Sequence, residues 1–389
     1  MTCEHERGDL ANGTVKQLPP AGPPLAGLTV VDLSRVLAGP FATMLLGDLG
    51  AQVIKVERPG AGDDTRNWGP PFVGLEGEQQ STYFLSANRN KRSIMLDLRA
   101  DEDLATLKSL LRHADVLVEN FRPGVMDRLG LSAEILEELN PSLVSLSISG
   151  FGSIGPDRTR VGYDQILQAE GGLMSLTGLG VPTRVGVPVA DLTAGLLGLV
   201  GVLAALLERT RSDLGQQVHT SLLAGMIALH TFQATRYLVA GEVPTPSGNQ
   251  HPTVCPYGMF WTEDAPIVLA VGNQIIWQRF APLVGIAADD APFRDNATRL
   301  ANAARPGGAH QHRTSNQAHS ALDGRLRCRR RARRRGQDPR QGLRQSARRG
   351  GGPRHRGDAP HPRCHPPARQ PAEIQPLAAG ASQTSTATG

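Results

Sequence analysis

The feature that most constrains the fold is a regular change between short apolar runs and helical segments over residues 28–149. Apolar runs of strand length occur at 28–33, 52–57, 93–98, 116–120 and 143–149. Segments with helical periodicity lie between them, at 40–49, 101–113 and 133–139. Short apolar strands joined through helices form a parallel sheet that helices cover on both faces. We therefore predict an α/β fold with a doubly wound parallel sheet, Rossmann-like in architecture.

The chain of 389 residues is long enough for two domains. Residues 1–25 are polar and rich in Pro and Gly, so we expect a disordered N-terminus. We assign residues 26–225 to the large α/β domain. Residues 226–304 are expected to form a smaller α+β domain. They combine a Pro/Gly-rich turn with strand-like runs and a helix, at 241–256, 257–262, 266–271 and 274–283.

Residues 305–389 differ in composition from the rest of the chain. They contain no Val, Phe, Tyr, Trp, Met or Lys, and Arg, Gly, Pro, Ala, His and Gln dominate. Such a basic low-complexity segment buries too little apolar surface to offset the entropy of ordering, so we expect a disordered tail. The change falls inside a predicted helix, which favours the hypothesis that the tail is translated out of frame. The alternative is a basic arm that binds nucleic acid, which the missing aromatic residues disfavour.

The cysteine content and the apolar segments indicate the compartment. Four cysteines without a pairing pattern are typical of a reducing cytoplasm: Cys3, Cys255, Cys328 and Cys364. The N-terminus has no apolar run of the kind that a secretory signal needs. The apolar helices are interrupted by glycine, threonine or charge and are shorter than a membrane span requires. We therefore expect a cytoplasmic protein with no membrane partner and no metal site.

A long apolar helix is predicted from Leu192 onward, directly after Asp191. Glycine recurs along it at positions 195, 198 and 201. Each glycine in a helix costs about 0.5–1 kcal/mol relative to alanine, so this stripe predicts close approach of another backbone. An acid at the start of such a helix is either an N-cap or a nucleophile whose ionised form the helix N-terminus favours. A second long helix is expected over residues 221–240.

The residues at the ends of the strands indicate the ligand class. The first strand–helix–strand unit lacks the G-x-G-x-x-G fingerprint of dinucleotide-binding proteins, although Glu57 ends the second strand as a ribose-binding acid would. Arginines occur at or near the strand ends instead: Arg58, Arg99, Arg122 and Arg128. Guanidinium groups pair bidentately with phosphate, so this edge is suited to a multiply phosphorylated ligand.

Several motifs, in the same order along the chain, resemble those of the family III CoA-transferases (CaiB/BaiF type). The motifs are Arg35-Val-Leu-Ala-Gly-Pro, Val53-Ile-Lys-Val-Glu-Arg-Pro-Gly, Asn88-Arg-Asn-Lys-Arg-Ser, Val118-Glu-Asn-Phe-Arg-Pro-Gly, Ser149-Gly-Phe-Gly-Ser-Ile-Gly-Pro and Gly162-Tyr-Asp. The stretch Ala61-Gly-Asp-Asp-Thr-Arg-Asn-Trp-Gly is especially similar to the succinate–hydroxymethylglutarate (glutarate) CoA-transferase branch. The resemblance covers residues 26–304 and does not include the tail.

The resemblance implies an enzyme that moves CoA from an acyl-CoA thioester to a small carboxylic acid, with a dicarboxylic acid as the expected acceptor. Asp191, in Pro188-Val-Ala-Asp-Leu, matches the nucleophilic aspartate of the family. The implied covalent path runs through an aspartyl anhydride and an aspartyl-CoA thioester. No tightly bound cofactor is implied, since CoA is a substrate. The interlocked homodimer of the family is the implied assembly.

The same resemblance implies a CoA site and a substrate loop. The residues matched to CoA binding are Leu37, Ala38, Arg58, Leu96, Asp97, Leu98, Arg99, Asn120, Phe121, Arg122, Arg128, Arg160 and Tyr163. The arginines would hold the phosphates, and Leu37 and Phe121 would contact apolar parts of the ligand. Gln250 and His251 match a loop that approaches the active carboxylate.

Two other functions stay open on the sequence. The α-methylacyl-CoA racemases share the fold but use a histidine where this chain has Tyr163, and a tyrosine is a poor base for α-proton abstraction at neutral pH. The other alternative is an inactive, truncated family member with a basic, nucleic-acid-binding tail, because the residues after 305 do not match the family's return to the large domain. The transferase is the favoured interpretation.

Overall fold

The computed structural model of the chain describes residues 22–261 and 266–303. Within them the fold separates into two compact units. Unit 1 holds residues 22–172 and 185–235, and unit 2 holds residues 173–184, 236–261 and 266–303. The expectations for the N-terminal segment up to residue 21 and for the tail lie outside the described residues.

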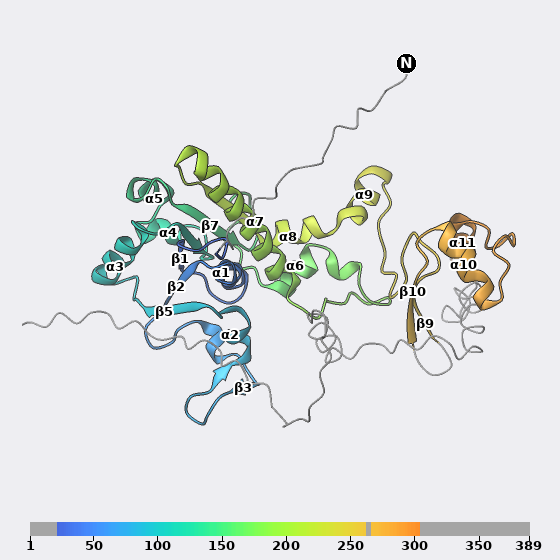
Figure 1. Ribbon diagram of the computed structural model, residues 1–389, viewed down its shortest axis with the longest axis horizontal. Helices are drawn as coiled ribbons and strands as arrows, with labels where there is room; N and C mark the ends of the chain where they lie inside the picture. The colour runs from blue at the N-terminus through green and yellow to red at the C-terminus, as the bar shows by residue number, and fades with distance from the viewer. Residues whose placement is uncertain (1–21, 262–265, 304–389) are drawn as a thin grey trace, which may run out of the picture. The chain divides into compact units, whose positions relative to one another are not determined.

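Unit 1 is built on a six-stranded sheet in the order β5-β2-β1-β6-β7-β8 (Figure 1). Its strands are β1 (Thr29–Asp32), β2 (Gln52–Glu57), β5 (Lys91–Met95), β6 (Val116–Glu119), β7 (Val144–Ser149) and β8 (Gln217–Ser221). Every neighbouring pair is parallel, which confirms the predicted α/β fold. Strand β5 begins and ends earlier than the predicted 93–98. Strand β8 escapes sequence reasoning because it is mostly polar, as an edge strand can be.

Helices cover both faces of this sheet. The helices up to residue 240 are α1 (Ala38–Asp48), α2 (Thr82–Ala87), α3 (Asp101–Leu111), α4 (Val125–Arg128), α5 (Ala133–Leu139), α6 (Asp164–Glu170), α7 (Val189–Ser212), α8 (Leu222–Leu229) and α9 (Thr231–Ala240). On one face α7 packs against α1, β7 and β8. An apolar cluster joins α3 and α5 to the sheet and includes Val31, Leu107, Leu117 and Leu136. The core of unit 1 therefore lies on both sides of the strands.

Helix α7 allows other elements to approach closely at its glycines. A Cβ on Gly195 would lie 2.6 Å from the Ala38 carbonyl oxygen of α1, so the predicted approach of another backbone is confirmed there. Gly198 and Gly201 instead face side chains of the sheet. Among the described helices, α7 alone is long and apolar enough to cross a membrane by length and composition, which corrects the expectation that the apolar helices are too short. Its face toward the sheet is buried, as in a core helix.

The predicted single helix over 221–240 is wrong. The chain ends β8 at Ser221 and then forms α8 and α9, separated by a break at Thr231, whose φ of 37° lies outside the helical range. The Ser221 hydroxyl caps α8 by accepting from the Ala224 amide at 3.0 Å. At the break, His230 Nε2 lies 2.5 Å from the Gly171 carbonyl oxygen. Apolar periodicity carries no signal of such a local change in φ.

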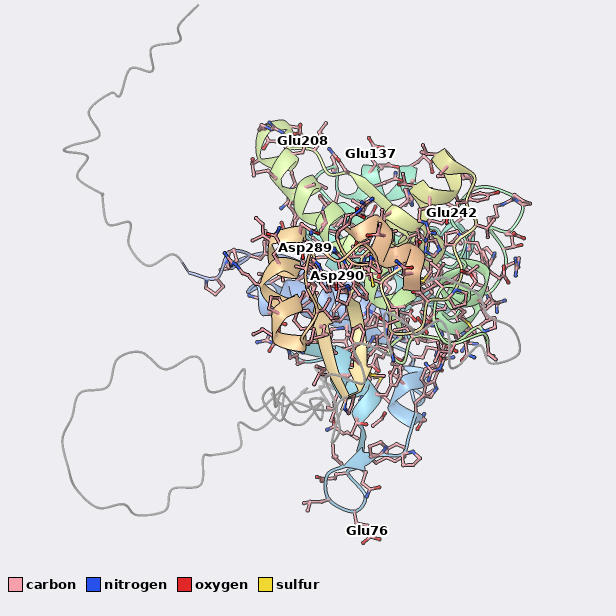
Figure 2. The ribbon with its side chains drawn as sticks, turned by 90° about the vertical axis from the view of Figure 1, so that its right-hand side faces the viewer. Glu76, Glu137, Glu208, Glu242, Asp289 and Asp290 are labelled. Atoms are coloured by element: carbon pink, nitrogen blue, oxygen red, sulfur yellow. The ribbon has the colours of Figure 1, made fainter. Side chains whose placement is uncertain are left out.

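A short hairpin precedes α2. Its strands β3 (Phe72–Val73) and β4 (Gln80–Ser81) pair antiparallel, and Glu76 lies at the tip of their loop (Figure 2). The Ser81 hydroxyl caps α2 by accepting from the Tyr83 amide at 3.1 Å. The Tyr83 ring meets Trp68 edge-on, with ring centroids 5.0 Å apart. These contacts hold the side chain of Tyr83 in place.

Unit 2 contains the strands and helix that the sequence predicts after residue 256. Its elements are a 3₁₀ turn (Leu173–Ser175), β9 (Tyr257–Trp261), β10 (Pro266–Ala270), α10 (Gln274–Phe280), a 3₁₀ turn (Ala281–Val284) and α11 (Asn296–Ala303). Strands β9 and β10 pair antiparallel. The buried Trp277 lies at the centre of its apolar cluster, and the buried Arg299 guanidinium lies 4.6 Å from the centroid of that ring.

Candidate active site

The strand order of unit 1 reverses between β1 and β6. From β1 the chain passes to β2 and β5 on one side and then returns to β6 on the other. Ligands of open α/β sheets bind at such a point, in the crevice beyond the carboxyl ends of the strands. Here two hydrogen bonds connect the loop after β1 with the loop after β6. The Arg35 amide donates to Asn120 Oδ1 at 2.8 Å, and Asn120 Nδ2 donates to the Arg35 carbonyl oxygen at 2.7 Å.

Asp191 lies in the first turn of α7. Its interpretation as an N-cap is wrong, because the helix begins at Val189 and the N-cap position is Pro188. The cap comes from another element: Asp164, at the start of α6, accepts from the Ala190 amide through Oδ1 at 2.9 Å. The carboxylate of Asp191 is therefore not used to cap its own helix.

The surroundings of Asp191 shift the pKa of its carboxyl group to near neutral pH. Burial and, next, the charge of Asp164 raise the pKa of Asp191 to about 7, against a hydrogen bond from the Ala38 amide that lowers it. Ala38 is the first residue of α1, so the carboxylate lies at a second helix N-terminus. Burial, then Asp191, then Asp164 raise the pKa of Tyr83 to about 12. Strongly shifted groups of this kind occur preferentially at functional sites.

A cavity of about 220 Å³ lies beside Asp191. Four arginines line it: Arg35, Arg122, Arg158 and Arg160. Arg160 already pairs with Glu170 and stacks over Phe151, 4.4 Å from the ring centroid. The other three form no ion pair with an acidic side chain among the residues that the structure describes. The cavity therefore combines the half-buried carboxylate of Asp191 with guanidinium groups that an anionic ligand can use.

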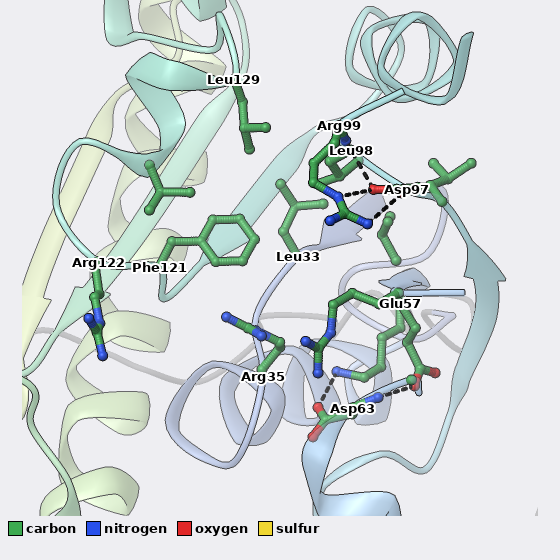
Figure 3. Close-up of a pocket in the computed structure, with 16 residues that line it drawn as sticks. Leu33, Arg35, Glu57, Asp63, Asp97, Leu98, Arg99, Phe121, Arg122 and Leu129 are labelled. Carbon is green, nitrogen blue, oxygen red and sulfur yellow. Dashed lines mark hydrogen bonds and ion pairs between the residues drawn. The ribbon is translucent and has the colours of Figure 1, made fainter. Parts of the chain in front are cut away.

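A larger cavity, of about 420 Å³, adjoins the first. Three residues line both cavities: Arg35, Phe121 and Arg122 (Figure 3). Apolar side chains form much of the larger wall, among them Leu33, Leu98 and Leu129. Arg99 pairs there with Asp97 at 2.9 Å, and Arg58 pairs with Asp64 at 2.7 Å. Together the two cavities suit a long ligand with apolar parts and several anionic groups.

The structure brings most of the predicted CoA-binding residues to these cavities. Those that line one or both are Ala38, Arg58, Leu96, Asp97, Leu98, Arg99, Asn120, Phe121, Arg122, Arg160 and Tyr163. Leu37 is buried and Arg128 is exposed, and neither is among the described residues that line them. Gln250 and His251 belong to unit 2, where Gln250 Nε2 donates to the Met259 carbonyl oxygen at 2.8 Å. The ligand roles of all these residues stay predictions.

Sequence reasoning missed the residues that hold Asp191 in place. Gln168 donates to Asp164 Oδ2 at 2.8 Å and accepts from the Val185 amide at 2.8 Å, so it ties α6 to the segment before α7. The only signal was the position of Asp164 at the start of a helix in Gly162-Tyr-Asp. Arg158 was also missed, since an arginine in a polar loop carries no distinguishing pattern.

Glu57 is occupied by protein groups. Arg66 binds both of its carboxylate oxygens, at 2.7 and 2.6 Å, and the Ser93 hydroxyl donates to it at 2.6 Å. The Asp63 amide donates to it as well, at 2.8 Å. A ribose-binding role for Glu57 is therefore excluded. Across residues 22–261 and 266–303, no group of three or more His, Cys, Asp or Glu side chains is arranged to hold a metal ion.

A family profile described as "CoA-transferase family III" matches residues 25–362. The chain belongs to this family. The match extends past residue 305, where we expected the resemblance to end. The chain is 44% identical to Succinate--glutarate CoA-transferase of Agrobacterium fabrum over 291 residues. This alignment covers 73% of each protein. It is also 44% identical to Succinyl-CoA:glutarate CoA-transferase of Mus musculus over 286 residues. That alignment covers 72% of this chain and 64% of the mouse protein.

A solved structure supports the same assignment. The crystal structure of a CAIB/BAIF family protein from Brucella suis is similar to this family III member, with a TM-score of 0.67 and 39% sequence identity. The similarity covers 85% of this chain and 82% of that chain. Family membership assigns the chain to the CoA-transferases, which use CoA thioesters as substrates. The resemblance found in the motifs and the enzyme class inferred from it are thus confirmed.

Proposed function

We propose that this family III member moves CoA between an acyl-CoA thioester and a small dicarboxylic acid, with Asp191 as the nucleophile. One observation carries the proposal: Asp191 is a half-buried carboxylate, not engaged as a cap, beside a cavity lined by arginines. The Ala38 amide and the N-terminus of α7 both favour its ionised form. A carboxylate with a pKa of about 7 is ionised in a large fraction of molecules at neutral pH, as nucleophilic attack requires.

The proposed chemistry is a series of acyl transfers at Asp191. A carboxylate oxygen attacks the thioester carbonyl carbon of the donor, the C–S bond breaks, and a mixed anhydride and CoA thiolate form. The thiolate attacks the aspartyl carbonyl carbon, which gives an aspartyl-CoA thioester and releases the donor acid. The acceptor carboxylate then attacks this thioester and expels the thiolate. The thiolate attacks the acceptor carbonyl carbon of the new anhydride, which gives the new acyl-CoA and restores Asp191.

CoA is proposed to extend through both cavities, with its sulfur in the cavity beside Asp191. The apolar wall of the larger cavity and the arginines at its lining support this placement. Arg58 and Arg99 pair with exposed or half-exposed carboxylates, so a phosphate can replace those weak ion pairs at little cost. Phe121 and Arg122 line both cavities and would contact the ligand along its length.

The acceptor class follows from the charge of the smaller cavity. One carboxylate of the acceptor must reach Asp191, and a second would pair with a guanidinium of Arg35, Arg122 or Arg158. The names of the relatives in Agrobacterium fabrum and Mus musculus also point to glutarate as an acid of this size. Glutarate should therefore be a better acceptor than butyrate, which lacks the second carboxylate.

Transfer from succinyl-CoA to a panel of acids tests the role of Asp191. We expect Asp191→Asn to lower kcat by about 1,000-fold or more, since the amide is a poor nucleophile. Asp213→Asn is the matched control, because Asp213 ends the same helix with a φ of 57° that asparagine tolerates. Full activity of Asp191→Asn would contradict the proposal. Deuterium exchange into the acyl group without CoA transfer would favour the racemase instead.

We also propose a homodimer. Exposed apolar side chains on α7 support it: Leu196, Leu197 and Val200. We propose a cytoplasmic enzyme without a tightly bound cofactor, with its domains at 26–225 and 226–304. Sedimentation velocity should give twice the chain mass of 41.5 kDa. An active monomer would contradict the dimer.

A further inference from the structure

We propose that the buried Lys55–Asp63 ion pair is a positioning element for the transfer reaction. It holds the turn at residues 34–36 so that the Ala38 amide stays directed at Asp191. The inference rests on the proposed role of Asp191 as the nucleophile. Both members of the pair line the larger cavity, but neither lines the cavity beside Asp191. Their effect on Asp191 therefore passes through the backbone that lies between them and the carboxylate.

The two side chains bind the turn from the side of β2. Lys55 Nζ lies 3.0 Å from Asp63 Oδ2, and the relative exposures of the two side chains are 1% and 0%. Lys55 Nζ also donates to the Ser34 carbonyl oxygen at 2.9 Å. Asp63 Oδ1 accepts a long hydrogen bond of 3.4 Å from the Val36 amide. The ion pair therefore reaches a carbonyl oxygen on one side of Arg35 and an amide on the other.

The turn itself has an unfavourable backbone conformation. Val36 has a φ of 69°, in the left-handed region that a β-branched residue rarely adopts. Such a conformation persists only where the surroundings over-determine it. Asn120 supplies the remaining constraint, because it binds the amide and the carbonyl oxygen of Arg35. Asn120 holds Arg35, whereas in the part of the chain that the structure describes the side chain that accepts from the Val36 amide is that of Asp63.

The turn is connected to Asp191 over a short distance along the chain. Helix α1 begins two residues after Val36 with Ala38, whose amide is the donor that lowers the pKa of Asp191. Ala38 also packs against α7, because a Cβ on Gly195, one turn after Asp191, would lie 2.6 Å from its carbonyl oxygen. Val36 and Ala38 both line the cavity beside Asp191. A change of φ at Val36 would therefore turn the start of α1 and move the donor away from the carboxylate.

Asp63 is itself rigidly placed. Its amide donates to Glu57, which Arg66 binds through two hydrogen bonds. Its Oδ1 also accepts from the Thr65 amide at 3.0 Å and the Thr65 hydroxyl at 2.7 Å. The pair thus fixes the turn after β1 relative to β2.

The test compares Asp63→Ala and Asp63→Asn with the full-length protein, and uses Arg209→Met as the matched control. Arg209 pairs with Asp115 at 2.9 Å, and Asp115 binds the Thr29 amide at the opposite end of β1, away from the turn. Two readouts are needed: amide hydrogen exchange of residues 34–38, which does not depend on activity, and the pH dependence of kcat and kcat/KM.

For Asp63→Ala we expect exchange in residues 34–38 to accelerate about tenfold or more, as the turn opens more often. We expect kcat to fall about 100-fold, the loss typical of a displaced reactive group, and to fall by more than KM rises. The acid limb of the pH profile should move to higher pH, because the carboxylate loses a stabilising donor. Asp63→Asn keeps an acceptor for Val36 and should restore part of each change.

Arg209→Met should lower stability without changing the exchange of residues 34–38 or the acid limb. A folded Asp63→Ala protein with wild-type exchange and a wild-type acid limb would overturn the inference. If Asp63→Ala does not fold, the same readouts on Asp63→Asn decide, with smaller changes in the same directions expected. Full activity of Asp191→Asn would instead show that the proposed function is wrong. An inactive Asp191→Asn beside an unaffected Asp63 variant would show that only the positioning role is wrong.

Discussion

Two acidic residues of unit 1 contact helix α1, and their electrostatic surroundings are opposite. Asp32 is fully buried beneath the helix, where the Thr43 hydroxyl donates to it at 2.7 Å. Burial disfavours its charge, but Lys91, then Lys55, and hydrogen bonds from Ser34 and Thr43 together outweigh that effect and lower the pKa of Asp32 to about 2. At Asp191, burial and next the charge of another carboxylate, Asp164, raise the pKa to about 7.

Burial disfavours the charge of both carboxylates, so the neighbouring charges and hydrogen-bond donors set their pKa values apart. The oxygens of Asp32 are bound by Lys91, Ser34 and Thr43, so an ionised Asp32 has no access to a ligand. Asp191 has one backbone donor and borders a cavity. The oxygens of Asp32 are therefore bound by protein groups, whereas the Asp191 carboxylate is open to a ligand in the cavity.

Removing the counter-ion of Asp32 should have the largest effect. Lys91 Nζ lies 3.0 Å from Asp32 Oδ2, and both side chains are fully buried. Burial lowers the pKa of Lys91 to about 8, so the pair is ionised at pH 7. Breaking a buried pair leaves an uncompensated charge, and Lys91→Met should lower the free energy of unfolding by about 3–5 kcal/mol. Urea unfolding at pH 7 measures this loss.

The pH dependence of that loss sharpens the comparison. In the wild-type protein, the stabilisation from Asp32 is complete above the ordinary pKa of 3.8 and is lost as the pH falls through about 2. In Lys91→Met, acid protonates the unpaired Asp32 and removes its buried charge, so the deficit should shrink on acidification. Arg211→Met, which breaks an exposed pair with Glu208, should change stability little. A Lys91→Met protein as stable as wild type at pH 7 would contradict this account.

Removing the neighbouring charge of Asp191 should have a smaller effect, on the pH profile. In Asp164→Asn the side-chain oxygen can still accept from the Ala190 amide, so the cap of α7 is kept. The loss of a negative charge lowers the pKa of Asp191, so the acid limb of kcat/KM should move from near pH 7 to lower pH. A profile measured from pH 5 to 9 tests this. An acid limb at the wild-type position would show that Asp164 does not influence the pKa of Asp191.

The fold and the position of Asp191 beside a cavity were predictable for particular reasons. The buried strands of the parallel sheet are short apolar runs, and such runs are visible in the sequence without knowledge of tertiary structure. Asp191 was singled out because Pro188-Val-Ala-Asp-Leu matches the nucleophilic aspartate of the family. Its place at the start of an apolar helix with recurring glycines left an N-cap and a nucleophile both open. Strand β8 was missed because its residues are polar.

The charge networks could not be predicted because they depend on the register of distant strands. Lys91 of β5 meets Asp32 of β1 although β2 lies between these strands in the sheet. Lys55 reaches the turn at Ser34 only because β2 pairs with β1 in parallel. Likewise, nothing in the local sequence shows that Asp164 rather than Asp191 caps α7, since both residues are suited to a helix N-terminus.

The most direct test of the central claim is to trap the covalent intermediate. The purified protein is mixed with succinyl-CoA without an acceptor, quenched in acid within seconds, digested and examined by mass spectrometry. We expect a CoA thioester on the peptide that contains Asp191, absent from Asp191→Asn and discharged when glutarate is added before the quench. Turnover with no adduct on this peptide, or an adduct on another residue, would contradict it.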